Sequence, residues 1–470
     1  MRAFLATSIG VACSAALVLP LALPASAAPA TSVTTPVSTP ASASLPAEAA
    51  VPGSTQSLPL RPLPAERATG AALQGLTRRD VRPFSLVGVV WDDPDAELHG
   101  SVQVRTRASG TGAWSGWQSV ETHNDDHAAD PGTPERDSGT VRGSTAPLWV
   151  GASDGVEVRV RAEAPRAGAS PAPLPRGMRI ELVDPGDEPA GEPAGEDTAQ
   201  GPEIPEGNDT GTTSGQVPVP ALTPEESATS AVNAELVPLG ATEIPELTKE
   251  ETEAAYADRF GEEAVTAKPY IGPRPRIVTR KGWGADEKLR ERNFVYTKSV
   301  QVAFVHHSAT GNNYTCKQAP SVLRSIYRYH VKSSGWRDFG YNFAVDKCGN
   351  IYEGRAGGVA KAVLGAHTRG FNTNSMGIAV LGTYSQSTPP ASAVTAVARL
   401  TAWKLGLYGK DPRGKSTLTS GGGNRYKKGT KVKLNAISGH RDGFSTECPG
   451  ARLYGKLGTV RSAAAKYQGR

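Results

Sequence analysis

Two histidines and one cysteine in the last third of the chain have the residue types of a metal centre. His306 ends the strand-like run Val302–His306, His440 follows the run Leu434–Gly439, and Cys448 lies eight residues further on. Ligands often converge on loops at strand ends, because the scaffold there is rigid. Imidazole and thiolate suit Zn²⁺, and three protein ligands leave a fourth tetrahedral position open, as in catalytic zinc sites. The pattern therefore indicates a catalytic zinc centre.

Other roles for the same residues stay open at this point. The histidines can be ordinary loop side chains, and Cys448 can be a thiolate nucleophile with His440 as its base. Cys448 can also form a disulfide, since the chain has four cysteines. A bridge between Cys316 and Cys348 is more economical, because both lie in expected loops beside one helix-to-hairpin unit. Cys448 then has no disulfide partner, and metal binding would account for its free thiol.

Strand-like and helix-like patterns alternate around these candidates. Apolar residues at helical spacing follow Pro320, and short β-favouring runs bounded by turn residues precede and follow that helix. The expected elements are helices over Pro320–Lys332, Ala393–Tyr408 and the residues after Pro449, a hairpin of Tyr341–Val345 with Ile351–Glu353, and a strand over Met376–Leu381. This alternation predicts an α/β domain over residues 270–470, with a central mixed β-sheet flanked by helices.

Residues 80–184 show a different pattern. Short runs such as Leu86–Trp91, Val102–Thr106 and Val156–Val160 favour strands, and two of these three alternate strictly between apolar and polar residues. Turn-rich segments separate them, and no helical period is visible. Short strands at this spacing predict an all-β, sandwich-like module.

Composition separates these two regions from two linkers. The 470 residues include 52 Gly and 37 Pro but only 38% hydrophobic and 6% aromatic residues, too few for one large core. Residues 28–79 are rich in Ala, Pro, Ser and Thr, and residues 185–268 are strongly acidic. Both are predicted to be disordered linkers, with room for a short helix around Glu250–Phe260.

The net charge of +5 conceals two opposed blocks. Residues 187–263 hold 19 acidic residues and two basic ones, whereas residues 270–470 hold 33 Lys and Arg against nine acidic residues, a net charge of +24. Such a field favours acidic partners, and anionic wall polymers suit an exported protein better than nucleic acid. One further hypothesis is that the acidic linker folds back and screens the basic domain.

The first 27 residues have the pattern of a secretory signal peptide. Arg2 precedes an apolar run from Leu5 to Leu23, and Ala25–Ala27 supplies a small-residue cleavage site. A membrane anchor and lipidation at Cys13 are the alternatives. No other stretch approaches the roughly 20 apolar residues that span a bilayer. The mature chain is therefore expected to be exported and to lack a transmembrane segment.

Five motifs follow one another in the last domain. They are Phe304–Thr310, Gly335–Phe343, Ile351–Arg355, Gly365–His367 with Asn374–Gly377, and Gly439–Asp442 through Cys448–Gly450. Together they resemble the family of peptidoglycan recognition proteins and bacteriophage T7 lysozyme, the zinc N-acetylmuramoyl-L-alanine amidases. The resemblance covers about residues 274–465. It implies hydrolysis of the amide between the lactyl group of N-acetylmuramic acid and the first L-alanine of the stem peptide.

The resemblance assigns roles at matching positions. His306, His440 and Cys448 correspond to the zinc ligands, and Tyr341 corresponds to the catalytic tyrosine. Thr446 stands where the phage enzyme has a catalytic lysine and where recognition-protein amidases often carry threonine. Non-catalytic members typically lose the zinc cysteine, so the presence of Cys448 favours an enzyme.

The resemblance also implies a substrate groove that includes Trp336, Arg355, His367 and Asn374. Arg355 is expected to meet a stem-peptide carboxylate. His367 is expected to contact substrate and take part in catalysis, and both His367 and Glu353 are candidates for protonating the leaving amine. The preference between diaminopimelate and lysine stays open.

These inferences combine into a secreted, monomeric, zinc-dependent amidase that acts on the muramyl peptides of peptidoglycan. Two alternatives stand beside it. One is a cell-wall-binding recognition protein with little or no catalysis, which the β-module and the basic field favour. The other is a Cys–His thiol hydrolase.

Overall fold

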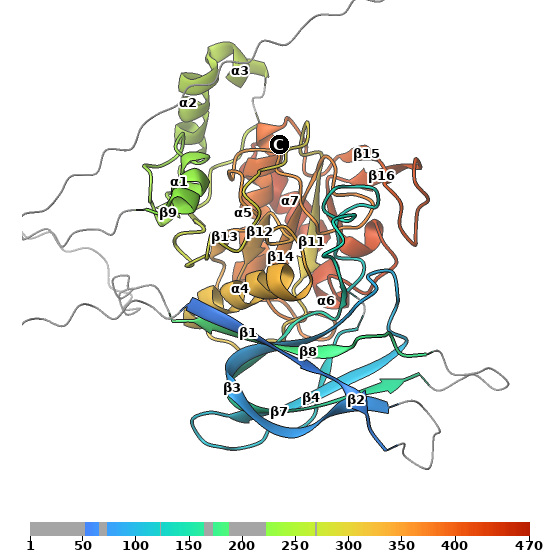
Figure 1. Cartoon of the computed structure of the whole chain (residues 1–470). Helices are drawn as coiled ribbons and strands as arrows, with labels where there is room; N and C mark the ends of the chain where they lie inside the picture. Colours follow the sequence, from blue (N-terminus) through green and yellow to red (C-terminus); the bar gives the residue numbers. More distant parts are fainter. Residues whose placement is uncertain (1–51, 65–72, 123, 164–172, 188–221, 268–269) are drawn as a thin grey trace, which may run out of the picture. The chain divides into compact units, whose positions relative to one another are not determined.

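The computed structural model describes residues 52–64, 73–122, 124–163, 173–187, 222–267 and 270–470 (Figure 1). The expected signal peptide and Cys13 lie outside these ranges. Within them, no helix combines the length and the apolar content that a bilayer crossing requires.

A seven-stranded mixed sheet forms the centre of the C-terminal domain, in the order β17-β11-β14-β12-β13-β10-β9. β11 runs parallel to β14 and β17, and β12 is parallel to β14 but antiparallel to β13. Every residue of β11 and β14 is buried, as in strands covered on both faces. The strands are β9 (Glu243–Ile244), β10 (Ile277–Val278), β11 (Val302–His307), β12 (Phe343–Val345), β13 (Ile351–Glu353), β14 (Ser375–Val380) and β17 (Ile437–Gly439).

Helices cover both faces of this sheet, which confirms the predicted α/β class. Ala303 and Val305 share a core with α5 and α7, whereas Ala344 and Ala379 pack with α4 on the opposite face. The helices are α4 (Ala319–Arg328), α5 (Ala391–Leu407), α6 (Ala451–Tyr454) and α7 (Leu457–Tyr467), with short turns η1 (Cys316–Gln318), η2 (Tyr329–Ser333) and η3 (His440–Asp442).

The expected strand over Leu434–Gly439 is wrong in one respect, because it is divided between two strands. β16 (Lys431–Asn435) pairs antiparallel with β15 (Lys415–Thr419) in a separate two-stranded sheet. β17 then joins the central sheet beside β11. A change of partner at Ala436 therefore interrupts a run that is continuous in sequence.

The N-terminal domain is built on an all-antiparallel sheet in the order β1-β8-β3-β7-β4-β5, with β2 and β6 also paired to β3. The strict alternation in β4 places Val102, Val104 and Thr106 in the interior, as predicted. The strands are β1 (Pro52–Pro59), β2 (Arg61–Pro62), β3 (Leu73–Trp91), β4 (Gly100–Ala108), β5 (Gln118–Val120), β6 (Gly143–Ser144), β7 (Leu148–Ala162) and β8 (Arg179–Gly186).

The described residues belong to one compact unit, in which the β domain packs against the α4 face of the α/β domain. Leu86 and Trp149 of the β domain share a buried cluster with α4 and Tyr329. The Tyr329 hydroxyl donates a hydrogen bond to the Thr145 carbonyl at 3.0 Å. A Cβ atom at Gly88 would lie 2.3 Å from that hydroxyl, so only glycine permits this approach.

The two linker predictions were too long. β1 and the start of β3 fall within residues 28–79, and β1 pairs with β8 along most of its length. Composition missed β1 because backbone pairing requires no aromatic side chain. The rest of this stretch up to residue 51, and residues 65–72, lie outside the described residues.

The acidic stretch 185–268 also contains ordered elements. α1 (Pro224–Ala231), α2 (Lys249–Phe260) and α3 (Glu262–Ala267) are helices, and α2 confirms the expected short helix. α1 and α2 each begin with a capping box, Thr223 with Glu226 and Thr248 with Glu251. Negative charge stabilises the first turn of a helix. Part of the acidic charge of this stretch therefore stabilises the beginnings of its helices.

The predicted disulfide between Cys316 and Cys348 is present and joins η1 to the turn between β12 and β13. The two residues are 32 positions apart. We expect the double substitution Cys316→Ser and Cys348→Ser to lower the free energy of unfolding by roughly 3–4 kcal/mol, because the unfolded chain regains loop entropy. Urea unfolding of both proteins measures this difference.

Reduction of the wild-type protein provides the control for this measurement. It should shift the unfolding midpoint as far as the double substitution does, and it should not affect the variant. Equal midpoints for the oxidised wild type and the variant would contradict the prediction.

Candidate metal centre

Parallel strand pairing places two histidines side by side. Val305 of β11 lies opposite Gly439 of β17. The residue that follows each of them, His306 and His440, therefore lies at the same edge of the sheet. The chain then returns through Cys448, whose carbonyl accepts a hydrogen bond from the Arg441 N–H at 3.0 Å. The structure thus brings together the three residues expected to bind metal.

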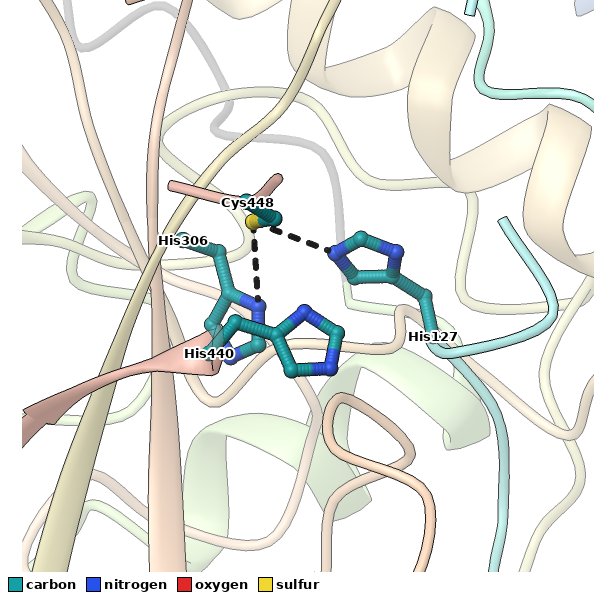
Figure 2. Close-up of side chains that lie close together, drawn as sticks. All are labelled: His127, His306, His440 and Cys448. Carbon is teal, nitrogen blue, oxygen red and sulfur yellow. Dashed lines mark hydrogen bonds between the residues drawn. The ribbon is translucent and has the colours of Figure 1, made fainter. Parts of the chain in front are cut away.

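A fourth residue, His127, completes this cluster (Figure 2). It comes from the connection between β5 and β6 of the β domain. One ligand atom from each of His127, His306, His440 and Cys448 lies within 4.8 Å of the others, and all four residues are buried. The Cys448 Sγ atom is 3.8 Å from His306 Nδ1 and 3.7 Å from His127 Nε2.

The cluster fits a tetrahedral metal ion. Zinc–nitrogen and zinc–sulfur bonds of ordinary length place tetrahedral ligand atoms about 3.5 Å apart, close to the two sulfur–nitrogen distances here. Both ring nitrogens of His440 are buried without a hydrogen-bond partner among the described residues. Unsatisfied buried nitrogens are costly, and a metal ion would satisfy one of them. Burial and the neighbouring histidines lower the pKa of His306, so the ring is neutral, the form that binds metals.

Asp126 orients the fourth histidine. Its carboxylate lies 2.8 Å from His127 Nδ1, which leaves Nε2 directed toward Cys448. Burial raises the pKa of Asp126, but the nearby His127 and His440 outweigh burial and bring the pKa below its usual range. A charged carboxylate behind a histidine is the usual arrangement around metal-binding histidines.

Tyr341 and Thr446 both lie at the cluster. The Tyr341 ring centroid is 5.2 Å from that of His306. The Thr446 hydroxyl accepts a hydrogen bond from the Cys448 N–H at 3.1 Å. Tyr341, Thr446, His127 and Cys448 line a cavity of about 20 Å³. A cavity of this size holds about one water molecule.

His367 and Trp336, both expected to contact substrate, are buried in this structure. The His367 ring packs edge-on against His306, and its Nδ1 lies 3.0 Å from the Thr368 hydroxyl. The Trp336 ring stacks on His330 with centroids 4.3 Å apart. Both rings support the walls of the site.

Asn374 was expected in the substrate groove, and Glu353 was a candidate proton donor. In this structure neither side chain lines the cavity beside Arg355, which we call the groove. Asn374 precedes β14, at the opposite end from the residue paired with His306, and its side chain accepts a hydrogen bond from the Ser299 N–H. Asn372, two residues earlier, lines the groove instead. The Glu353 carboxylate accepts hydrogen bonds from the Asn233 side chain and the Arg280 N–H, which hold it away from the cluster's cavity.

Arg355 lines this groove, and its guanidinium is paired with a carboxylate from the same chain. The guanidinium forms two hydrogen bonds of 2.8 Å to the two oxygens of Glu135. Glu135, Arg337, Arg355 and Asn372 line a cavity of about 140 Å³. Like His127, Glu135 belongs to the connection between β5 and β6.

Sequence reasoning missed Asp126, His127 and Glu135 because they lie in the module taken to be remote from the chemistry. One signal was present. The connection between β5 and β6 is long for an antiparallel sheet, and long connections without strands or helices of their own are usually functional.

Two families match the chain. Residues 296–451 match the family of N-acetylmuramoyl-L-alanine amidases, and residues 39–179 match the Rv3811 N-terminal galactose-binding domain-like family. The second match agrees with the all-β fold of the N-terminal domain.

Individual relatives agree with the first match. Peptidoglycan-recognition protein SC2 of Drosophila simulans is 31% identical over 185 residues, which are 39% of this chain and 85% of that protein. The human N-acetylmuramoyl-L-alanine amidase is 30% identical over 210 residues, 44% of this chain and 31% of the human protein. The solved structure of Drosophila PGRP-LB is 26% identical with a TM-score of 0.31, covering 39% of this chain and 92% of that one.

The chain belongs to the family of peptidoglycan recognition proteins and type 2 N-acetylmuramoyl-L-alanine amidases.

The burial of Cys448 yields a test of the thiol-hydrolase alternative. The residue is only 3% exposed, so an alkylating reagent has almost no access to it in the folded protein. We expect iodoacetamide to leave Cys448 unmodified under native conditions and to modify it fully after denaturation. Peptide mapping by mass spectrometry reads this position separately from Cys13. Rapid native alkylation at Cys448 would instead indicate an accessible nucleophile.

Proposed function

We propose that the protein is a secreted, zinc-dependent N-acetylmuramoyl-L-alanine amidase that cleaves the bond between N-acetylmuramic acid and L-alanine in peptidoglycan. The observation that carries this proposal is the convergence of His306, His440 and Cys448 at one sheet edge in a chain of this family. Cys448 is the residue that non-catalytic members of the family typically lack.

His306, His440 and Cys448 would hold the zinc ion. Zinc in such a site supplies a Lewis acid for the scissile carbonyl and acidifies water. Tyr341 and Thr446 would provide the hydrogen-bonding groups around that carbonyl. Burial raises the pKa of the Tyr341 phenol well above its usual value, so the hydroxyl stays protonated and donates. A donor aimed at developing negative charge stabilises the transition state.

Arg355 would bind the stem peptide. Its guanidinium lies in the groove with a planar, two-pronged donor set, which suits a carboxylate. The basic domain would add attraction to anionic wall polymers through its net charge of +24 over residues 270–470. We propose on these grounds that the protein acts at the cell wall.

A recognition protein without catalysis is the second candidate. The occupation of Arg355 by Glu135 favours it, since the groove of this structure is not open to substrate. The two candidates differ in whether stem peptides are released.

The zinc ligands allow a direct test of the catalytic proposal. We expect Cys448→Ala to lose bound zinc and at least 100-fold of the hydrolysis of purified peptidoglycan, because the substitution removes the thiolate, the one anionic ligand among the four residues of the cluster. Elemental analysis measures the metal, and mass spectrometry detects released stem peptides. His99→Ala is the matched control, since His99 is exposed in the β domain and should leave both quantities unchanged.

Two outcomes would contradict the catalytic proposal. One is full hydrolysis by the zinc-free Cys448→Ala protein. The other is zinc-loaded protein that binds muramyl peptide and releases no stem peptide, both as wild type and with His127 replaced by alanine.

A further inference from the structure

We propose that residues 124–142 of the β domain form an internal inhibitor of the amidase site, with His127 as a fourth metal ligand and Glu135 in the place of a substrate carboxylate. We call this segment the plug. The inference rests on the proposed function, because it assigns a regulatory role at that same site. It joins two observations that are independent of each other, one at the metal cluster and one at Arg355.

The first observation is that His127 closes the metal site. Its ring centroid lies 4.5 Å from that of His440 and 5.2 Å from that of His306. Nε2 approaches Cys448 Sγ as closely as His306 Nδ1 does. Four histidine and cysteine ligands are typical of structural zinc sites, whereas catalytic sites keep one position open. His127 therefore converts an open three-residue site into a closed one.

The second observation is the ion pair between Glu135 and Arg355. Both side chains are more than nine-tenths buried, and the pair is bidentate. The Arg337 N–H also donates to Glu135, at 3.2 Å. Burial raises the pKa of Glu135, but Arg355 outweighs it and keeps the carboxylate charged. Glu135 thus satisfies the group that a stem-peptide carboxylate would need.

The plug is attached to the groove between these two points as well. Asp130 accepts hydrogen bonds from the Gly370 N–H at 2.8 Å and the Asn372 side chain at 2.6 Å. The Asn372 amide also donates to the Ala128 carbonyl, and the Arg369 N–H donates to the Asp126 carbonyl. Pairing with both side chains and backbone is how a groove holds a bound peptide.

The far end of the plug contacts the turn at Gly335. The Thr140 hydroxyl donates to the Gly335 carbonyl at 2.9 Å, and the Arg142 N–H donates to the Ser334 carbonyl at 3.0 Å. A Cβ atom at Gly335 would lie 1.9 Å from the Thr140 carbonyl, and φ there is +75°. The plug and the α/β domain are therefore in direct backbone contact here.

Charge and volume agree with inhibition. The plug carries five acidic and two basic residues, and it lies on a domain of net charge +24. With the plug in place, the cavity beside the cluster measures about 20 Å³, room for a water molecule and far too little for a muramyl peptide. Substrate can reach the cluster only when the plug leaves.

Metal coordination in the full chain tests the assignment of His127 as a ligand. We expect X-ray absorption of the zinc-loaded protein to show three imidazoles and one sulfur around zinc. In His127→Ala we expect one imidazole to be replaced by a light oxygen ligand. Two imidazoles, one sulfur and an oxygen ligand in the wild type would overturn the assignment of His127.

Binding of a soluble muramyl peptide tests whether the plug competes with substrate for the groove. Calorimetry should show at least 10-fold tighter binding by Glu135→Gln and by His127→Ala than by the wild type, with His99→Ala as the unchanged control. Glu135→Gln retains the side-chain shape, and circular dichroism confirms that each variant is folded. Binding equal to the wild type in both folded variants would overturn the plug.

Hydrolysis of the same soluble muramyl peptide separates failure of the plug from failure of the proposed function. Variants that release stem peptides at least 10-fold faster than the wild type support both. If the variants bind the muramyl peptide more tightly but none of them releases stem peptide, the plug is supported and catalysis is rejected. Equal, rapid release by the wild type and all variants retains catalysis and rejects the plug. Loss of release in zinc-loaded His127→Ala would make His127 a catalytic residue and also reject the plug.

Discussion

The parallel pairing of β11 with β17 is the constraint on which the rest of the site depends. It places His306 and His440 at one sheet edge although 133 residues separate them along the chain. Because these strands are buried on both faces, a slip of one residue would turn each histidine to the opposite face and disrupt the core as well. The stability of the sheet therefore fixes the positions of the two histidines. The loop that carries Cys448 then has only to bring the thiol to these two side chains.

The β domain is part of the site's surroundings rather than a separate module. The β domain docks on α4 and, through the hydrogen bond of Tyr329 to Thr145, on η2. This docking sets the distance that the connection between β5 and β6 must cover. The ion pair between Glu135 and Arg355 then fixes the position of this connection on the α/β domain. Buried ion pairs add little net stability compared with apolar packing, but they penalise every arrangement that leaves one charge alone. Such a pair therefore favours one bound position of the segment over slightly shifted positions.

The sequence predicted those features that depend on local pattern or on a motif within one domain. The α/β class, the disulfide, and the proximity of His306, His440, Cys448 and Tyr341 belong to this group. Two kinds of feature were not predictable. β1 and α1–α3 lie in stretches whose composition suggests disorder, yet they gain order from sheet pairing and from capping residues such as Thr223. His127 and Glu135 act across the domain boundary, and no periodicity in either domain encodes how two surfaces meet.

Because plug and groove belong to one polypeptide, their encounter is intramolecular. A tethered segment competes at a high effective concentration, of the order of millimolar for short flexible connections. A dilute, monovalent wall fragment is then a poor competitor, whereas an insoluble polymer that also engages the basic surface at several points gains by avidity. In the proposed amidase, this architecture would make activity depend on the physical form of the wall: the plug would stay in place with soluble fragments and leave the groove on intact wall.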